Sequence, residues 1–123
     1  MAFAVQAPTS RPVSPIGAPV AVTVRLERAR TVVVLQGEAD LSATPLLSDV
    51  FARMIATRTG DVIVDMAAVE FIDTAAFRTL AIAHGLLARR DRRLTFRGPS
   101  RPTGRLLSLF GLSGFIEPDA PDV

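Results

Sequence analysis

One stretch decides the organisation of this chain: VIVDMAAVEFIDT, at residues 62–74. Its first three residues are apolar and β-branched, which is typical of a short strand covered on both faces of a sheet. We expect Asp65 to end this strand. After a short connection, the chain is expected to pack against the core again through three apolar residues, Val69, Phe71 and Ile72.

A helix is expected to begin at Asp73 and Thr74 and to run to about Arg90. Asp and Thr side chains accept hydrogen bonds from the free N–H groups at a helix start, so capping alone explains both residues. The position also suits a switch, because the partial positive charge of a helix start tolerates a phosphate on the Thr74 hydroxyl. Such a phosphate would add about two negative charges without unfolding the domain.

The remaining strands follow from periodicity. Residues 20–26 alternate apolar and polar side chains, as a half-buried strand does. Residues 31–35 form a β-branched run that Gly37 is expected to end. Residues 94–97 alternate again, and residues 115–116 are expected to add a short last element.

Two further helices are predicted. The first has Ser42 or Thr44 as its cap and Pro45 in its first turn, where the missing N–H of proline costs nothing. Large apolar side chains recur on one of its faces, and Gly60 marks its end. The second spans roughly Arg101–Phe110.

The elements therefore alternate in the order β-β-α-β-α-β-α. This order predicts an α/β fold with a mixed sheet of four to five strands and about three to four flanking helices. Residues 1–18 contain several prolines among small and polar residues, and we expect a disordered or extended leader there. The domain is then expected at residues 19–118, and residues 119–123 form a short tail.

Composition restricts the function. The chain has 123 residues, 49% of them hydrophobic, which suits one domain. The lack of cysteine excludes disulfides and thiolate sites. All 14 basic residues are arginine, the net charge is only +2, and no long basic stripe occurs, so direct nucleic-acid binding is not expected. With no apolar run of about 18 residues and no secretory signal, we expect a cytoplasmic protein without membrane insertion.

Residues for catalysis are scarce. A Ser-His-Asp triad needs a histidine, and the single histidine, His84, is expected to pack near the core edge of a helix. The patterns GxSxG, Walker A and GxGxxG are absent. Glu38 and Asp40 are close enough to share a turn, but two carboxylates alone indicate loop solvation and capping. We therefore expect no enzymatic activity, no cofactor and no metal site.

Three parts of the chain resemble STAS domains. The run VVLQGEADL at residues 33–41 is similar to their opening, apolar-apolar-x-Gly-Glu-apolar-Asp. Residues 62–74 are similar to their middle signature, a strand followed by Asp-Leu-Ser-x-Val-x-Phe-Ile-Asp-Ser. Residues 106–115 are similar to their last helix, which ends in Leu-x-x-x-Gly-Leu. The resemblance covers about residues 20–117 and agrees with the order of elements derived above.

This resemblance implies a bacterial anti-sigma-factor antagonist, which regulates transcription. In that family the domain binds an anti-sigma factor, often a GHKL-type kinase, and the kinase phosphorylates the antagonist. By position, the resemblance makes Thr74 the phosphoacceptor. It also implies a partner-binding surface that consists of Asp40, Asp73, Thr74, Ala75, Ala76, Phe77 and Arg78.

Two alternatives remain open. Ala75 and Ala76 stand where the family usually has a hydroxyl residue and a glycine. This departure favours a STAS scaffold module in a transporter or signalling complex, without phosphorylation. The third hypothesis, an enzyme that binds a small molecule or a nucleotide, is based only on the α/β architecture, from which no chemistry follows.

Overall fold

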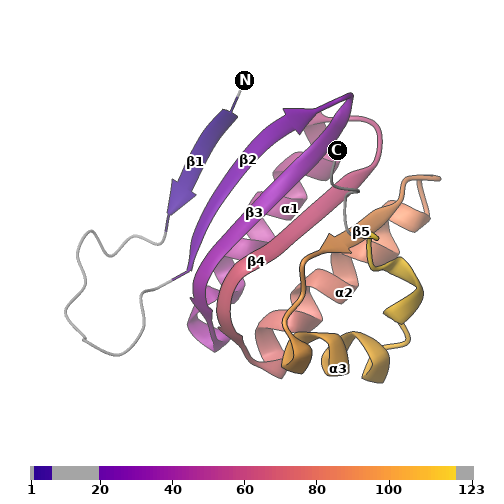
Figure 1. The fold of residues 1–123 in the computed structure, drawn as a ribbon. Coiled ribbons are helices and arrows are strands. Elements are labelled where there is room, and N and C mark those ends of the chain that lie inside the picture. Colours follow the sequence, from indigo (N-terminus) through magenta and orange to yellow (C-terminus); the bar gives the residue numbers. More distant parts are fainter. Residues whose placement is uncertain (1, 7–19, 119–123) are drawn as a thin grey trace, which may run out of the picture.

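The computed structural model describes residues 2–6 and 20–118. Within these residues, five strands form one sheet in the order β1-β2-β3-β4-β5 (Figure 1). Strands β1, β2 and β3 pair antiparallel, whereas β4 is parallel to both β3 and β5. From β1 to β5, the strands span Ala2–Gln6, Ala21–Glu27, Arg30–Ala39, Val62–Ile72 and Leu94–Arg97.

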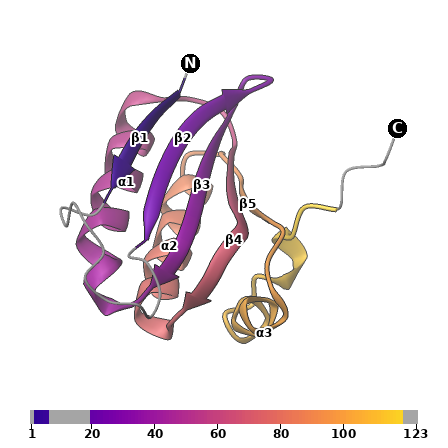
Figure 2. The ribbon, with the colours of Figure 1, turned by 60° about the vertical axis from the view of Figure 1, so that its left-hand side comes forward.

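Helices flank this sheet. In the described part of the chain, three α-helices, α1 to α3, span Thr44–Thr57, Thr74–Ala88 and Arg101–Leu109, and two short 3-10 helices, η1 and η2, span Leu41–Ala43 and Ser113–Phe115. Helices α1 and α2 lie behind one face of the sheet, and α3 lies beyond the β5 edge (Figures 1 and 2). We call the other face, which no described helix covers, the open face. The predicted fold class, a mixed sheet with flanking helices, is confirmed.

The core lies between the sheet and helices α1 and α2. Buried residues in α1 recur three and four positions apart, a spacing that places them on one side of a helix: Leu47, Val50, Phe51 and Met54. They meet apolar side chains from the central strands, which include Val33, Leu35, Val62 and Val64. This packing fixes where α2 begins relative to the strand ends.

Strand β4 is longer than the sequence indicated. It continues to Ile72, so the expectation that Asp65 ends the strand is wrong. The cause is a pair of bulges: at two places β4 carries one more residue than the β3 segment with which it pairs. Buried residues in this half of the strand therefore recur every third position, at Met66, Val69 and Ile72. Phe71, which was expected to pack against the core, is 51% exposed instead.

The approach to α1 also differs from the prediction. Strand β3 runs past Gly37, because a glycine adopts its φ of +89° without strain. Neither Ser42 nor Thr44 caps α1 with its side chain. Asp40 caps η1 instead, and η1 leads directly into α1. The helix ends before Gly60, which lies in the following turn.

The structure describes part of the expected N-terminal leader. Ala2–Gln6 form strand β1, which is the extended rather than the disordered form of the expected leader. They pair with the edge of β2, whose backbone groups would otherwise lack partners. Residues 7–19 and 119–123 lie outside the described residues, so the leader and the tail stay predictions there. The predicted last element exists as η2, and Ile116 forms a bridge to Phe96 of β5.

Candidate functional site

The start of α2 is held firmly at the end of the sheet. The Asp73 side chain accepts a hydrogen bond from the Ala76 N–H at 2.8 Å, so Asp73 is the cap that the sequence predicted. The Asp73 carbonyl accepts from the Phe77 N–H at 2.9 Å, and the Asp73 N–H donates to the Ala39 carbonyl at 3.0 Å. These bonds tie the helix to β3 and fix the direction of its first turn.

Residues 73–78, which we call the α2 tip, divide into an outer and an inner half. Thr74 and Arg78 are exposed, and Ala75 is half-buried. Ala76 and Phe77 are fully buried. Their side chains therefore offer no exposed surface to a partner, although the sequence placed both residues in the partner-binding set. The reason is helical geometry, because a helix that packs on a sheet turns about half of its residues inward.

Phe77 anchors the tip. Its ring lies 6.1 Å from the Phe96 ring and 4.9 Å from the Phe110 ring, centroid to centroid. These contacts join α2 to β5 and to the residue that follows α3. Aromatic pairs at such distances add to the stabilisation from burial itself. The contacts of the buried half of the tip therefore hold its exposed half in place.

Asp40 lies at the same end of the sheet, directly after β3, and is exposed. Its carboxylate accepts bonds from the Ser42 hydroxyl and from the Ser42 N–H, the latter at 2.9 Å. These bonds hold the pKa of Asp40 below its usual value, so the side chain is ionised at neutral pH. Since η1 packs beside α2, Asp40 and Thr74 belong to one surface region.

Sequence reasoning missed two apolar residues in this region. Leu41 is 66% exposed and follows Asp40, and Phe71 lies two residues before Asp73. Phe71 was assigned to the core because its neighbour Ile72 is apolar as well. The triplet spacing of buried residues in β4 was the available signal, but it becomes visible only when the bulges are known.

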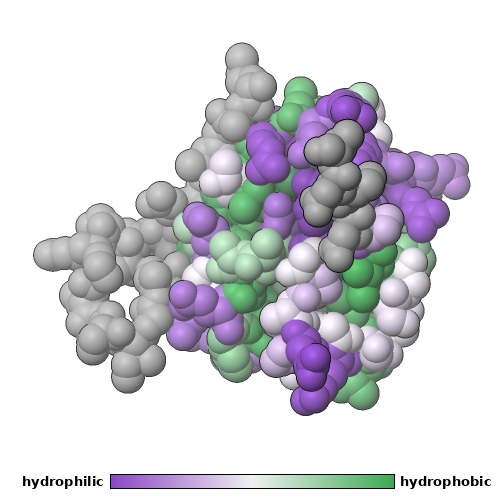
Figure 3. Space-filling model, viewed as in Figure 1, coloured by the Kyte–Doolittle hydropathy of each residue, from purple (hydrophilic) through white to green (hydrophobic). Residues whose placement is uncertain are grey.

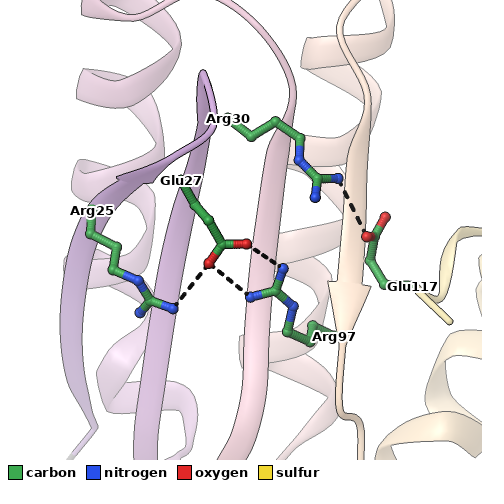
Figure 4. Close-up of polar contacts among 5 residues, drawn as sticks. All are labelled: Arg25, Glu27, Arg30, Arg97 and Glu117. Carbon is green, nitrogen blue, oxygen red and sulfur yellow. Dashed lines mark hydrogen bonds and ion pairs between the residues drawn. The ribbon is translucent and has the colours of Figure 1, made fainter. Parts of the chain in front are cut away.

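The open face carries a polar arch formed by Arg25, Glu27 and Arg97 (Figure 4). Arg97 donates to both Glu27 oxygens, at 2.8 and 3.3 Å, and Arg25 lies 3.4 Å from one of them. The arch spans the sheet from β2 to β5. It crosses the paired residues Val32 and Ile63, which have no exposed surface although they point away from the helices.

The arch changes two ionisation equilibria. Hydrogen bonds from Arg97, more than those from Arg25, lower the pKa of Glu27. The same pairing raises the pKa of Arg97. Both groups are therefore charged at neutral pH. In the arch one carboxylate is shared by two guanidinium groups, so its charged groups are bound to one another rather than free to react.

Other candidate chemistry does not converge on a site. His84 packs as expected: its ring nitrogen Nδ1 donates to the Leu94 carbonyl at 3.2 Å, and its ring meets Phe115 edge-on at 4.3 Å. Among residues 2–6 and 20–118, no group of three or more His, Asp or Glu side chains is placed to hold a metal ion. None of the helices in that part of the chain is long and apolar enough to cross a membrane.

A family model agrees with this architecture. The model described as "Mlab, STAS domain" matches residues 22–117. The chain belongs to the STAS-domain family. The resemblance noted in the sequence is thereby confirmed, and the family's middle signature is the segment that runs from β4 into α2. A search among curated proteins found no match.

Solved structures with the STAS fold include several antagonists. An anti-sigma factor antagonist from Mycobacterium paratuberculosis has a TM-score of 0.71 and 22% identity, over 84% of this chain and 86% of that one. The Bacillus cell fate determinant SpoIIAA in its phosphorylated form has a TM-score of 0.68 and 16% identity, over 78% and 88%. A sulfate transporter family protein from Wolinella succinogenes has 0.59 and 19%, over 72% and 71%. At such identities, these similarities establish the fold.

Proposed function

We propose that this STAS domain is an anti-sigma-factor antagonist that acts in the bacterial cytoplasm. It binds an anti-sigma factor, a GHKL-type kinase, through the exposed half of the α2 tip, and it releases a sigma factor for transcription. The kinase phosphorylates Thr74 and so weakens the complex. The protein recognises its partner and catalyses no reaction.

The exposure of Thr74 on the first turn of α2 carries this proposal. Thr74 is exposed as a whole residue, while Asp73 and Phe77 hold the backbone beneath it. A helix start accepts a phosphate electrostatically, so modification changes the surface and leaves the fold intact. The resemblance to SpoIIAA, which is solved both with and without phosphate, supports the same reading.

The burial of Ala76 removes one argument against the antagonist. This alanine stands where the family usually has a glycine, and its methyl group would hinder a partner if it faced outward. The methyl group has no exposed surface, so it lies in the core of the protein. Ala75 remains a departure, since it offers no second hydroxyl group.

A second function is supported by the description of the family model and by transporter neighbours. That model is named for Mlab, and a sulfate transporter family protein shares the fold. In this alternative the same tip binds a transporter subunit without phosphorylation. Thr74 then serves only as part of the contact surface.

Binding to purified anti-sigma factors of the source organism tests the proposal. We expect Thr74→Glu to weaken the complex at least about tenfold, because a charge must be stripped of water under the partner. Ser108→Glu places the same charge on exposed α3 and is the matched control, and Thr74→Ser should still be phosphorylated. Equal affinity of Thr74→Glu and wild type would refute the switch, and phosphate-free Thr74 in host cells would favour the transporter module.

A further inference from the structure

We infer that Leu41 and Phe71, which we call the apolar pair, form the main contact of the α2 tip, and that the partner offers an apolar cleft with a basic rim. This inference rests on the proposed function, since it describes the partner of the same surface. It adds two contact residues that the sequence did not indicate. It also states what the partner surface must provide.

Leu41 and Phe71 lie near the ends of two adjacent strands, beside the α2 tip. Phe71 precedes Asp73 at the end of β4, and Leu41 follows Asp40 after the end of β3. The two strands end side by side, because Ala39 pairs with Ile72. With 66% and 51% of their surfaces exposed, Leu41 and Phe71 leave much apolar area in water. Covering such area is the main favourable contribution in protein association.

Backbone features hold both side chains outward. In β4, the second bulge lies between Val69 and Phe71 relative to β3, and it leaves Glu70 and Phe71 exposed in succession. Bulges next to functional sites commonly redirect a side chain. On the other side, the carboxylate of Asp40 caps η1, whose first residue is Leu41. Asp40 is therefore a positioning residue for Leu41.

Four carboxylates lie close to the apolar pair along the chain. Asp40 and Glu70 are exposed, and Glu38 and Asp73 are half-buried. Each lies within three residues of Leu41 or Phe71 in the chain. An apolar contact flanked by negative charge fits a cleft ringed by Lys or Arg, because complementary charges speed encounter and exclude wrong partners. We therefore commit to a basic protein partner, and a second copy of this acidic surface is an unsuitable one.

A phosphate on Thr74 would weaken binding through such a surface. Thr74 lies three residues from Phe71, so a phosphate there would enter an apolar contact and would lose hydration. We expect the cost of this lost hydration to exceed the attraction between the phosphate and the basic rim. The inferred surface thus explains how one modification can weaken a contact whose other charges are favourable.

Photocrosslinking in the native host identifies the occupant without assuming its class. p-Benzoylphenylalanine replaces Leu41 or Phe71, and it replaces Leu109 in the matched control, which is 80% exposed on α3. We expect crosslinks from both test positions to one basic protein, and none to that protein from the control. If the crosslinked protein is a transporter subunit, the anti-sigma assignment is refuted, but the inferred contact surface is still supported. Crosslinks to a second copy, equal yields at all positions, or no crosslinks would overturn the inference.

Affinity measurements with the crosslinked protein complete the test. We expect Leu41→Ser and Phe71→Ser each to weaken binding about tenfold or more, and Leu109→Ser less than about twofold. Glu70→Lys should slow association at low salt, and the difference should shrink at high salt. If Thr74→Glu abolishes binding while both serine variants match Leu109→Ser, the proposed function stands and the inference fails.

Discussion

The two ends of the sheet use charge in opposite ways. At the α2 tip, carboxylates cap helices and leave apolar side chains exposed beside them. At the other end, where β4 and β5 begin, arginines gather in the β2–β3 hairpin and in the loop after α2. Figure 3 shows hydrophilic side chains concentrated at the top and upper right, where these segments lie. We call this region the arginine end.

Several arginines at the arginine end are bound within the chain. Arg92 donates to the carbonyls of Gly60 and Ile55, at 2.8 and 3.1 Å, and so closes the end of α1. Arg93 lies over the Phe115 ring at 5.4 Å. Arg30 pairs with Glu117 at 3.3 Å and ties the last described residues to β3 (Figure 4).

The difference separates structural charge from functional charge. A guanidinium group that already bonds to backbone carbonyls cannot leave them for a partner without loss of stability. A carboxylate that caps a helix can still contact water, and the capping bond fixes the position of the neighbouring residues. Density of charge alone would have marked the arginine end as the binding surface, whereas the intramolecular contacts of Arg30, Arg92 and Arg93 give these three groups a structural role.

The largest expected effect concerns the inner half of the tip. Phe77→Ala removes a fully buried ring that contacts Phe96 and Phe110. We expect a loss of about 3–5 kcal/mol in the free energy of unfolding, measured by chemical denaturation. Phe77→Leu, which keeps apolar volume, should lose less and should bind the partner as wild type does at a temperature where it is folded. If folded Phe77→Leu no longer bound the partner, the buried half of the tip would also contribute to binding, contrary to the division into an outer and an inner half.

Sequence patterns predicted the fold well where one periodicity held along an element. The alternation at residues 20–26 and the helical spacing in α1 reflect single faces packed on one core, and both elements were found. The cap at Asp73 was also found, because capping depends on local chemistry. Element order then restricted the topology to few choices.

The site was less predictable because it depends on relations between strands. Whether Phe71 points to the core or to water depends on bulges relative to β3, and a single strand does not reveal them. Ala76 and Phe77 were assigned to the surface because the family motif marks a stretch, not a face. The main error is that Phe77 was expected at the surface and Phe71 in the core, whereas the structure shows the reverse. For Phe71, the error arises from the register between β3 and β4.

An intermediate effect tests the arginine end. Arg92→Met keeps the apolar stem and removes the bonds to Gly60 and Ile55. We expect a loss of about 2 kcal/mol in unfolding free energy, since hydrogen bonds from a charged donor contribute more than neutral ones. Partner binding should stay within about twofold. Exposed Arg89→Met is the control and should change stability by less than about 0.5 kcal/mol. Weakened binding by Arg92→Met would remove the distinction between the two ends.

The smallest effect concerns the polar arch, which lies between the two ends. Glu27→Gln should cost about 1 kcal/mol at neutral pH, near the upper limit for a partly exposed ion pair. Asp49→Asn, which breaks the exposed pair of Asp49 with Arg53 on α1, should cost less. Because the pKa of Glu27 is lowered in the folded state, its carboxylate binds fewer protons there than in the unfolded chain.

The stabilisation by Glu27 should therefore be complete above the ordinary glutamate pKa of about 4.5 and decline as pH falls through the lowered value. Denaturation of wild type and Glu27→Gln between pH 7 and about pH 3 measures this difference, which should shrink toward acid. A difference that stays constant would mean that Glu27 acts by packing over Val32 and Ile63. Partner binding should not change in either variant, because neither Glu27 nor Asp49 belongs to the tip.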